Sequence, residues 1–286
     1  MSDKAQQLTA TIADSIKALC TETDEVRQSA LFKNWLNTLS RFHKYSFGNC
    51  ILIAIQAPDA SRVAGFHTWK ELGRNVKKGE KGIRILAPIV RKVDEQVKGN
   101  TETVSRPVGF RCVSVFSYEQ TEGRELPELE YNAKEGGDTL LPMLEKVAAE
   151  LKIDLVYKAI ESGADGLSRG GSIEIEESLD TPARCGVLAH ELAHELLAHK
   201  ARRDETTKQQ RETEAEAVAY AVLSHFGMRL ESRFYLASYG ITAEMFTASI
   251  QNIANTAKTI ITMIDNHDAD EESAAEGSGA LLVAAA

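Results

Sequence analysis

The sequence has few cysteines and no long apolar run. Its four cysteines, Cys20, Cys50, Cys112 and Cys185, lie far apart, so no CxxC pair is present to form a thioredoxin-like redox motif or a zinc ribbon, and we expect reduced, mostly buried thiols. No stretch approaches the roughly 18 apolar residues of a membrane span, and no apolar segment follows Met1 as in a signal peptide. These absences predict a cytoplasmic protein that has no membrane partner.

The charge of the chain is unevenly distributed. A net charge of -9 over 286 residues argues against nucleic-acid binding by the chain as a whole. Residues 61–92, however, contain nine basic side chains and only two acidic ones, which gives this segment a local positive field. The length and a hydrophobic content of 43% suffice for about two domains with real cores. One domain can therefore attract an anionic partner although the whole chain is acidic.

Aromatic side chains accompany the basic segment: Phe66, His67 and Trp69 lie within it, and Tyr45 and Phe47 precede it. Unpaired bases stack on aromatic rings, worth about 1–3 kcal/mol per base, while lysine and arginine neutralise phosphates, so the combination favours single-stranded nucleic acid. Core aromatic residues beside a solvated lysine-rich turn would have the same composition. The candidate contact residues are Tyr45, Phe47, Asn49, Trp69, Arg74, Lys77, Lys78, Lys81 and Arg84.

Residues 190–194 have the sequence HELAH, an HExxH motif within an expected helix. Residues four apart lie on one face of a helix, so His190 and His194 can bind the same metal ion. Glu191 projects about a quarter-turn away and is suited to act as general base on a water molecule at that metal. The alternative is a chance pair of core histidines beside a solvated glutamate, which would bury polar groups without partners.

The third metal ligand is less clear from the residues. His199 follows nine residues after His190 and would lie about 180° round a continuous helix, so we do not expect it to reach the same metal. The metzincin class breaks that helix with a glycine, which this segment lacks. Residues 211–222 predict a second helix with acidic residues among small apolar ones. Its glutamates compete equally for the ligand position or form a solvated acidic face. They are Glu212, Glu214 and Glu216.

A strand and a helix start precede the motif. Gly170–Glu176 alternates polar and apolar residues after a glycine turn, which predicts a half-buried strand. We expect it to be an edge strand that holds an extended peptide. Thr181 is a suitable N-cap and Pro182 a suitable first residue for the helix that carries the histidines.

The motif and the second helix together resemble a known family. HELAH followed by a helix with the pattern E-x-E-A-x-x-x-A resembles the ImmA/IrrE-type metallopeptidases, which have a gluzincin-like arrangement. In that pattern the glutamate directly before alanine is the ligand, which corresponds to Glu214. The resemblance implies a Zn²⁺ site formed by His190, His194 and Glu214, with Glu191 as general base. Three protein ligands leave the fourth zinc position open for water, as hydrolysis requires.

The first half of the chain resembles a second family. Its segments YSFGN (45–49), VAGFHTWK (63–70), GRNVKKGEKGIR (73–84) and VFSYEQTEG (115–123) are similar, in this order, to the N-terminal domain of ArdC-type antirestriction proteins. The resemblance covers roughly residues 5–127. It implies a domain that binds single-stranded DNA, followed by a C-terminal metallopeptidase domain.

The expected fold is α+β with two domains, an N-terminal helical domain with a β-hairpin and a C-terminal gluzincin-like peptidase domain with a small sheet. The domains are 1–127 for single-stranded DNA binding and 139–267 for the peptidase, joined by a linker at 128–138 with a flexible Gly136-Gly137 and followed by a disordered acidic tail at 268–286. The expected helices are 5–20, 26–41, 46–56, a short one near Trp69, 139–151, the two metal helices and 242–264. The expected strands are 82–91 and 104–116 in the hairpin, then 153–158 and the edge strand.

These features predict a zinc-dependent peptidase joined to a single-stranded-DNA-binding domain. It would act on an unknown protein or peptide substrate and protect incoming DNA, as the resemblance to ArdC-type proteins implies. Two alternatives stay open. One is a non-proteolytic protein that shields single strands and has a structural or vestigial metal site. The other is an ImmA-like regulatory peptidase that cleaves a repressor.

Overall fold

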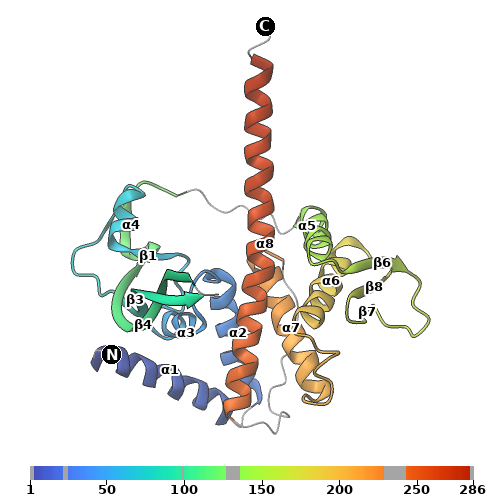
Figure 1. Ribbon diagram of the computed structural model, residues 1–286, viewed down its shortest axis with the longest axis horizontal. Coiled ribbons are helices and arrows are strands. Elements are labelled where there is room, and N and C mark those ends of the chain that lie inside the picture. Colours follow the sequence, from blue (N-terminus) through green and yellow to red (C-terminus); the bar gives the residue numbers. More distant parts are fainter. Residues whose placement is uncertain (1–2, 22–24, 98–99, 127–135, 229–242, 284–286) are drawn as a thin grey trace. The chain divides into compact units, whose positions relative to one another are not determined.

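The computed structural model describes the backbone of residues 3–21, 25–97, 100–126, 136–228 and 243–283, and the side chains of 3–19, 30–92, 105–126, 137–228 and 247–267. The chain divides into two compact units, Met1–Thr23 with Ala30–Glu128, and Asp24–Ser29 with Leu129–Ala286. We call them the N-terminal unit and the C-terminal unit. Each combines helices with small sheets (Figure 1), which confirms the predicted α+β class.

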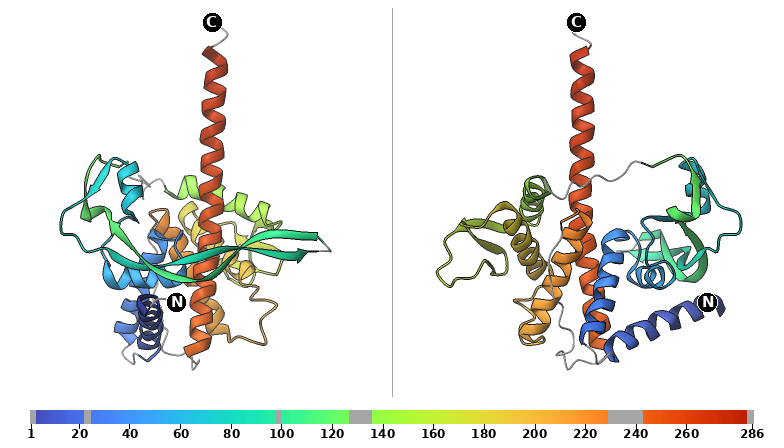
Figure 2. Two further views of the ribbon diagram at one scale, coloured as in Figure 1. Left: turned by 60° about the vertical axis from the view of Figure 1, so that its left-hand side comes forward. Right: turned by 180° about the vertical axis from the view of Figure 1, so that it is seen from behind.

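The first half of the chain contains the predicted helices and hairpin. The helices are α1 (Asp3–Thr21), α2 (Glu25–Arg41), α3 (Phe47–Gln56) and α4 (Phe66–Glu71). One sheet has the order β1-β4-β3 and the other pairs β2 with β5, all antiparallel. The strands are β1 (Val63–Gly65), β2 (Arg74–Val76), β3 (Ile83–Val97), β4 (Asn100–Ser117) and β5 (Thr121–Gly123), with a 3-10 turn at Tyr118–Gln120. The hairpin of β3 and β4 is longer than predicted and forms an extended ribbon (Figure 2).

Side chains of α3 cover the open edge of β3. The Asn49 amide donates to the carbonyl of Leu86 and accepts from its N–H, both at 2.8 Å. Two helical turns later, the Gln56 amide makes the same pair of bonds to the backbone of Arg84, both at 2.9 Å. Pro88, the next residue of β3 in this alternation, has no N–H to satisfy. The two amides therefore replace a neighbouring strand along this part of the edge.

The C-terminal unit combines a small mixed sheet with helices, of which α5 and α6 contact the sheet. Its helices are α5 (Gly136–Glu150), α6 (Thr181–Leu196), α7 (Lys208–His225) and α8 (Ala243–Val283), and its strands are β6 (Asp154–Lys158), β7 (Gly166–Ser168) and β8 (Ser172–Glu176). Strand β8 pairs with β6 in parallel and with β7 antiparallel. The prediction that residues 170–176 form an edge strand is therefore wrong, because β8 is the central strand and β7 lies at the edge.

Helix α7 is buried around most of its circumference, because alanines and valines alternate with its polar residues and α6 and α8 pack against it.

The predicted linker and tail differ from the structure. Gly136 and Gly137, predicted as a flexible point, are the first two residues of α5. Residues 127–135 of the predicted linker lie outside the described part of the chain. Helix α8 continues to Val283, where a disordered tail was predicted, and the alanines and glutamates of residues 271–276 favour a helix. None of the described helices is both long and apolar enough to span a membrane.

Candidate metal centre and nucleic-acid surface

Helix α6 carries the HExxH motif into the core of the C-terminal unit. Its N-cap is Asp180 rather than the predicted Thr181: the Asp180 carboxylate accepts the N–H of Ala183 at 2.9 Å, and Pro182 occupies the first turn. The apolar side of α6, with Leu188 and Leu192, is fully buried. This burial fixes the rotation of the helix and so sets which way the motif points.

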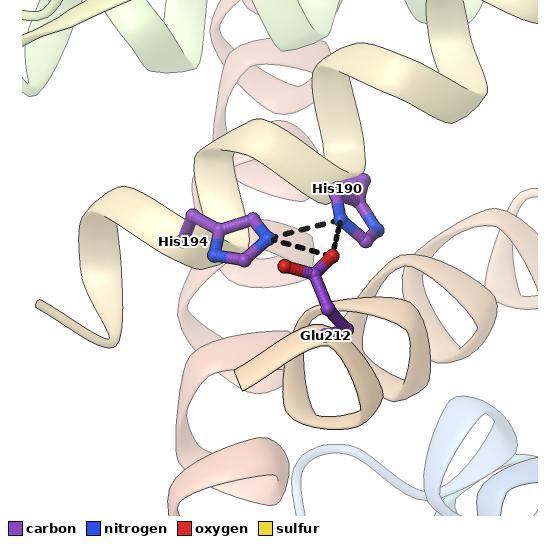
Figure 3. Close-up of side chains that lie close together, drawn as sticks. All are labelled: His190, His194 and Glu212. Atoms are coloured by element: carbon purple, nitrogen blue, oxygen red, sulfur yellow. Dashed lines mark hydrogen bonds and ion pairs between the residues drawn. The ribbon is translucent and has the colours of Figure 1, made fainter. Parts of the chain in front are cut away.

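The two histidines and one glutamate converge (Figure 3). Nε2 of His190 and Nε2 of His194 are 3.0 Å apart. Oε2 of Glu212, from α7, lies 3.5 Å from the first and 3.7 Å from the second. One ligand atom from each of the three residues lies within 4.8 Å of the others. Two imidazoles and a carboxylate are a donor set that suits zinc with an open fourth position, so the residues fit a catalytic metal.

Glu214, the ligand implied by the family pattern, is not in this group. Residues two apart on a helix point about 200° apart, so Glu212 and Glu214 cannot both face α6. The carboxylate of Glu214 is 1% exposed and lies 2.9 Å from Nε2 of His199, with Gln210 and Ser249 also bonded to it. The structure therefore brings Glu212 to the two histidines and gives Glu214 a different set of partners.

His199 lies closer to the motif than the sequence predicts. The expectation of a continuous helix fails because α6 ends at Leu196 and Ala198 adopts a left-handed conformation with φ of 52°. The chain turns back, and Nδ1 of His199 lies 2.8 Å from Nδ1 of His194. His199 thus contacts the ring nitrogen of His194 that faces away from Glu212, and it is not one of the three convergent residues.

Glutamates control the charge of the first histidine. Nδ1 of His190 lies 3.4 Å from Oε2 of Glu216, one turn after Glu212 on α7. Burial alone would lower the pKa of His190, but the contacts with Glu212 and Glu216 and the nearby charge of Glu191 outweigh it and raise the pKa to about 9. Burial raises the pKa of Glu212 less than its contacts with His190 and His194 lower it, so Glu212 is ionised. A metal ion would therefore compete with a proton for the ring of His190.

Glu191 lies beside the convergent residues, at the wall of a pocket of about 420 Å³ that also borders His190, Val187 and Gly166. The side chain is 8% exposed, and this burial raises its pKa above the ordinary range, against the opposing charges of the two histidines. A β-carbon on Gly166 would lie 2.5 Å from Val187 and 2.9 Å from the Glu191 side chain. Strand β7 therefore approaches α6 closely because residue 166 has no side chain.

Glu195 connects α6 to the sheet by hydrogen bonds. Its Oε1 accepts from the hydroxyl of Ser168 at 2.5 Å and from the N–H of Gly170 at 2.7 Å, and its Oε2 accepts from the N–H of Gly171 at 2.6 Å. Both glycines have positive φ, 74° and 101°, so the turn presents two N–H groups to one carboxylate. Sequence reasoning missed this role, since nothing local distinguishes Glu195 from a solvated glutamate.

Three of the predicted DNA contacts are buried structural residues of the N-terminal unit. Asn49 bonds the backbone of β3, as described above. The indole N–H of Trp69, 2% exposed, donates to the carbonyl of Phe116 at 2.9 Å. Arg74, 5% exposed, bonds Thr121 at 2.8 Å and stacks over Tyr118 at 3.9 Å. These corrections have one cause, because aromatic and basic composition does not reveal which side chains face the core.

The other predicted contacts divide in two. Tyr45 and Phe47 are partly buried: the Tyr45 hydroxyl donates to the carbonyl of Val63 at 3.0 Å, and the Phe47 ring packs edge-on against Trp35. The remaining four are exposed basic side chains, namely Lys77, Lys78, Lys81 and Arg84. Lys81 and Arg84 border a pocket of about 730 Å³.

The β3–β4 ribbon carries Arg84, which is among the predicted contacts, and four further cations that are not. Residues 83–92 and 105–117 contain five basic side chains and no acidic one. Apolar side chains of the ribbon are also exposed, including Val90 at 53% and Phe110 at 40%. The basic members are Arg84, Arg91, Lys92, Arg106 and Arg111, all exposed. We call these five residues with Phe110 the basic ribbon.

Comparisons with known proteins match a different family to each half of the chain. Residues 2–116 match the profile of the N-terminal domain of anti-restriction factor ArdC. Residues 148–224 match that of the IrrE N-terminal-like domain of peptidase family M78. The chain has an ArdC-type architecture. Its second half carries the M78-like domain in the region of the convergent residues.

The solved structures and the curated protein that this chain resembles are distant from it in sequence. The metal-free crystal structure of the antirestriction ArdC protein from the R388 plasmid has a TM-score of 0.52 and 17% identity, over 94% of this chain and 99% of that chain; this likeness establishes the fold. The Mn(II)-bound structure of that protein has a TM-score of 0.44 at 17% identity, over 81% and 96% of the two chains. An uncharacterized Bacillus anthracis protein is 26% identical over 276 residues, 80% of this chain, which spans about half, 47%, of that relative's length.

Proposed function

We propose that this chain is a zinc-dependent peptidase joined to a domain that binds single-stranded DNA, and that it protects incoming DNA as an antirestriction protein. The observation that carries the enzymatic part is the convergence of His190, His194 and Glu212 beside Glu191. The match to the ArdC N-terminal domain supports the biological part. DNA binding would bring the peptidase to protein substrates that are themselves bound to DNA.

The residues at the pocket suit peptide hydrolysis. Zinc held by His190, His194 and Glu212 would supply a Lewis acid next to the scissile carbonyl. Glu191 accepts the proton of the attacking water molecule and then delivers it to the leaving amine. Its partly desolvated carboxylate has a raised pKa, which brings proton uptake and release closer to neutral pH. The pocket of about 420 Å³ beside Glu191 gives room for a substrate side chain.

Strand β7 is suited to align the substrate. It is the edge of the β6-β8-β7 sheet in the described part of the chain, and it approaches α6 so closely that a β-carbon on its Gly166 would lie 2.9 Å from the Glu191 side chain. An extended peptide that pairs with β7 would gain backbone hydrogen bonds without any demand on its side chains. This assignment moves the peptide-holding role predicted for residues 170–176 to residues 166–168.

Replacing Glu191 with glutamine tests the enzymatic proposal. The change removes the proton acceptor but keeps the shape, so we expect zinc to stay bound and peptidase turnover to fall by about 10²–10⁴. Glu161→Gln, an exposed site on the loop before β7, is the matched control and should not alter turnover. Zinc content and cleavage of a peptide library would be measured for both. If Glu191→Gln still protects incoming DNA as well as the unaltered protein, the non-proteolytic alternative is correct.

The basic ribbon is the proposed DNA surface, because it joins exposed cations to an exposed aromatic ring. The double change Arg91→Glu with Lys92→Glu should weaken binding of a single-stranded oligonucleotide. It should also reduce the slope of log affinity against log salt by about 0.7 for each phosphate that the variant no longer neutralises. The control Arg203→Glu with Lys208→Glu makes the same charge change in the C-terminal unit. Equal affinities for both doubles, or equal binding of duplex DNA, would count against the ribbon.

A further inference from the structure

His194, His199 and Glu214 form a continuous chain of contacts that peptide hydrolysis, as proposed above, does not require. Nδ1 of His194 lies 2.8 Å from Nδ1 of His199, and Nε2 of His199 lies 2.9 Å from Oε2 of Glu214. The chain therefore uses both ring nitrogens of His199 and leads from the metal-facing histidine on α6 to a carboxylate on α7.

The far end of this chain is buried and fully bonded. His199 is 3% exposed and Glu214 is 1% exposed. Oε1 of Glu214 accepts from the amide of Gln210 at 3.0 Å and from the hydroxyl of Ser249 on α8. Gln210 in turn donates to Ser249 at 3.1 Å. Because a buried carboxylate without partners would cost several kcal/mol, so many donors around one glutamate indicate that it is held there as an anion.

Counting hydrogens assigns the tautomer of each ring. An ionised Glu214 can only accept, so Nε2 of His199 carries the hydrogen that points at it. A neutral His199 then has an unprotonated Nδ1, which can only accept. The short contact with His194 therefore requires that Nδ1 of His194 carries a hydrogen, and this leaves Nε2 of His194 with its lone pair free. Nε2 is the atom that faces Glu212 and His190.

The geometry points to His199 and Glu214 as positioning residues that fix the tautomer and orientation of His194, so that its Nε2 is ready to bind the metal. The inference rests on the proposed metal site. Each of the two metal-facing histidines then has an outer glutamate from α7, Glu216 for His190 and Glu214 for His194. Glu216 lies next to Nδ1 of His190 directly and is 38% exposed, whereas Glu214 acts on His194 through a buried imidazole. Outer partners of this kind typically change metal affinity by 10–100-fold when removed.

The first measurement needs no substitution. Side-chain nitrogen NMR of the metal-free, full-length protein, with labelled histidine, distinguishes the two neutral tautomers. We expect the Nδ1–H tautomer for His194 and the Nε2–H tautomer for His199. The opposite tautomer at His199 would overturn the inference, even if the protein binds zinc as proposed.

The second measurement compares substitutions at His199 by competition for Zn²⁺ with a chromophoric chelator. His199→Leu removes the acceptor beside His194, and we expect zinc affinity to fall 10–100-fold. His199→Asn places an amide oxygen close to the position of Nδ1 and should recover most of that loss. His225→Leu, at the far end of α7, is the matched control and should bind zinc as the unaltered protein does. Circular dichroism would check that each variant is folded.

The outcomes separate this inference from the proposed function. If the unaltered protein binds no zinc, the proposed metal site fails, and the tautomers alone decide whether the chain of contacts exists. If the unaltered protein binds zinc and His199→Leu binds it equally well, the positioning role is wrong and the metal site stands. If Glu214→Gln abolishes zinc binding while Glu212→Gln does not, Glu214 is itself a ligand and the inference is overturned.

Discussion

The two amides by which α3 covers the edge of β3 allow a quantitative test, because they make the same bonds in different surroundings. Asn49 is 7% exposed, and Gln56 is exposed to solvent. In the variant Asn49→Ala, the N–H and C=O of Leu86 lose their partners at a partly buried position of the strand. Each bond contributes about 1 kcal/mol net, and each unsatisfied buried group costs about 1–3 kcal/mol. We therefore expect Asn49→Ala to lower the free energy of unfolding by about 2–4 kcal/mol.

Gln56→Ala removes an equivalent pair of bonds, but water can replace them at the backbone of Arg84. We expect a loss below about 1 kcal/mol for this matched control. Asn49→Asp keeps an acceptor for the Leu86 N–H but turns a carboxylate oxygen toward the Leu86 carbonyl. It should destabilise at least as much as Asn49→Ala, since the repulsion between these two partly buried oxygens adds to the missing bond.

The assay can isolate the N-terminal unit within the full chain. The sequence has two tryptophans, Trp35 and Trp69, and both are buried in this unit at 6% and 2% exposure. Tryptophan fluorescence in urea therefore follows the N-terminal unit alone. With a slope of about 2 kcal/mol per molar urea, the expected loss moves the midpoint of Asn49→Ala by about 1–2 M.

Two results would refute this reasoning. Equal midpoints for Asn49→Ala and Gln56→Ala would mean that burial does not decide the cost of the missing bonds. Weaker binding of single-stranded DNA by Asn49→Ala with an unchanged midpoint would mean that Asn49 contacts DNA, as its sequence context first suggested.

Two further predictions concern the C-terminal unit. Gly166→Ala should reduce peptide cleavage by about 10²-fold while zinc stays bound, because its β-carbon overlaps Val187 and displaces Glu191; equal cleavage rates in the variant and the unaltered protein would contradict the close approach of β7. The pKa of about 9 for His190, against 6.5 when unfolded, means that the stabilising contribution of this proton is present below about pH 6.5 and lost as the pH rises through about 9. Zinc must displace this proton, so zinc affinity should rise over the same range, and chelator titrations that show no change would exclude the shift.

The periodicity of the sequence predicted most of the helices and the pairing of β3 with β4, because these depend on neighbours in the chain. The convergence of His190 with His194 was also predictable, since the spacing of four residues fixes their common face. The choice between Glu212 and Glu214 was not, because both positions fit the same helix. The rotation of α7 about its axis decides which glutamate faces the histidines. That rotation depends on the burial of the alanines of α7 and on contacts of Glu214 with residues as distant as Ser249.

Other features depend on single residues or on distant pairing. The left-handed conformation of Ala198 ends α6 early and returns His199 to the motif, and alanine carries no sequence signal for that conformation. Residues 172–176 alternate in polarity as an edge strand would, but β6 and β7 pair with both sides of β8. The burial of Trp69 and Arg74 likewise follows from contacts with Phe116 and Thr121, which are remote in sequence.

The hydrogen bonds from Gly170 and Gly171 to Glu195 fix the position of β7 along α6. A substrate that pairs with β7 would therefore also have a fixed position along α6. Glu195 lies four residues after Glu191, a rise of about 6 Å along the helix, which matches about two residues of an extended chain. A peptide paired with β7 would therefore meet Glu191 at a register fixed by the helix rather than by its own sequence. Lengthening the turn by one residue would move the cleaved bond along the peptide without altering any metal ligand.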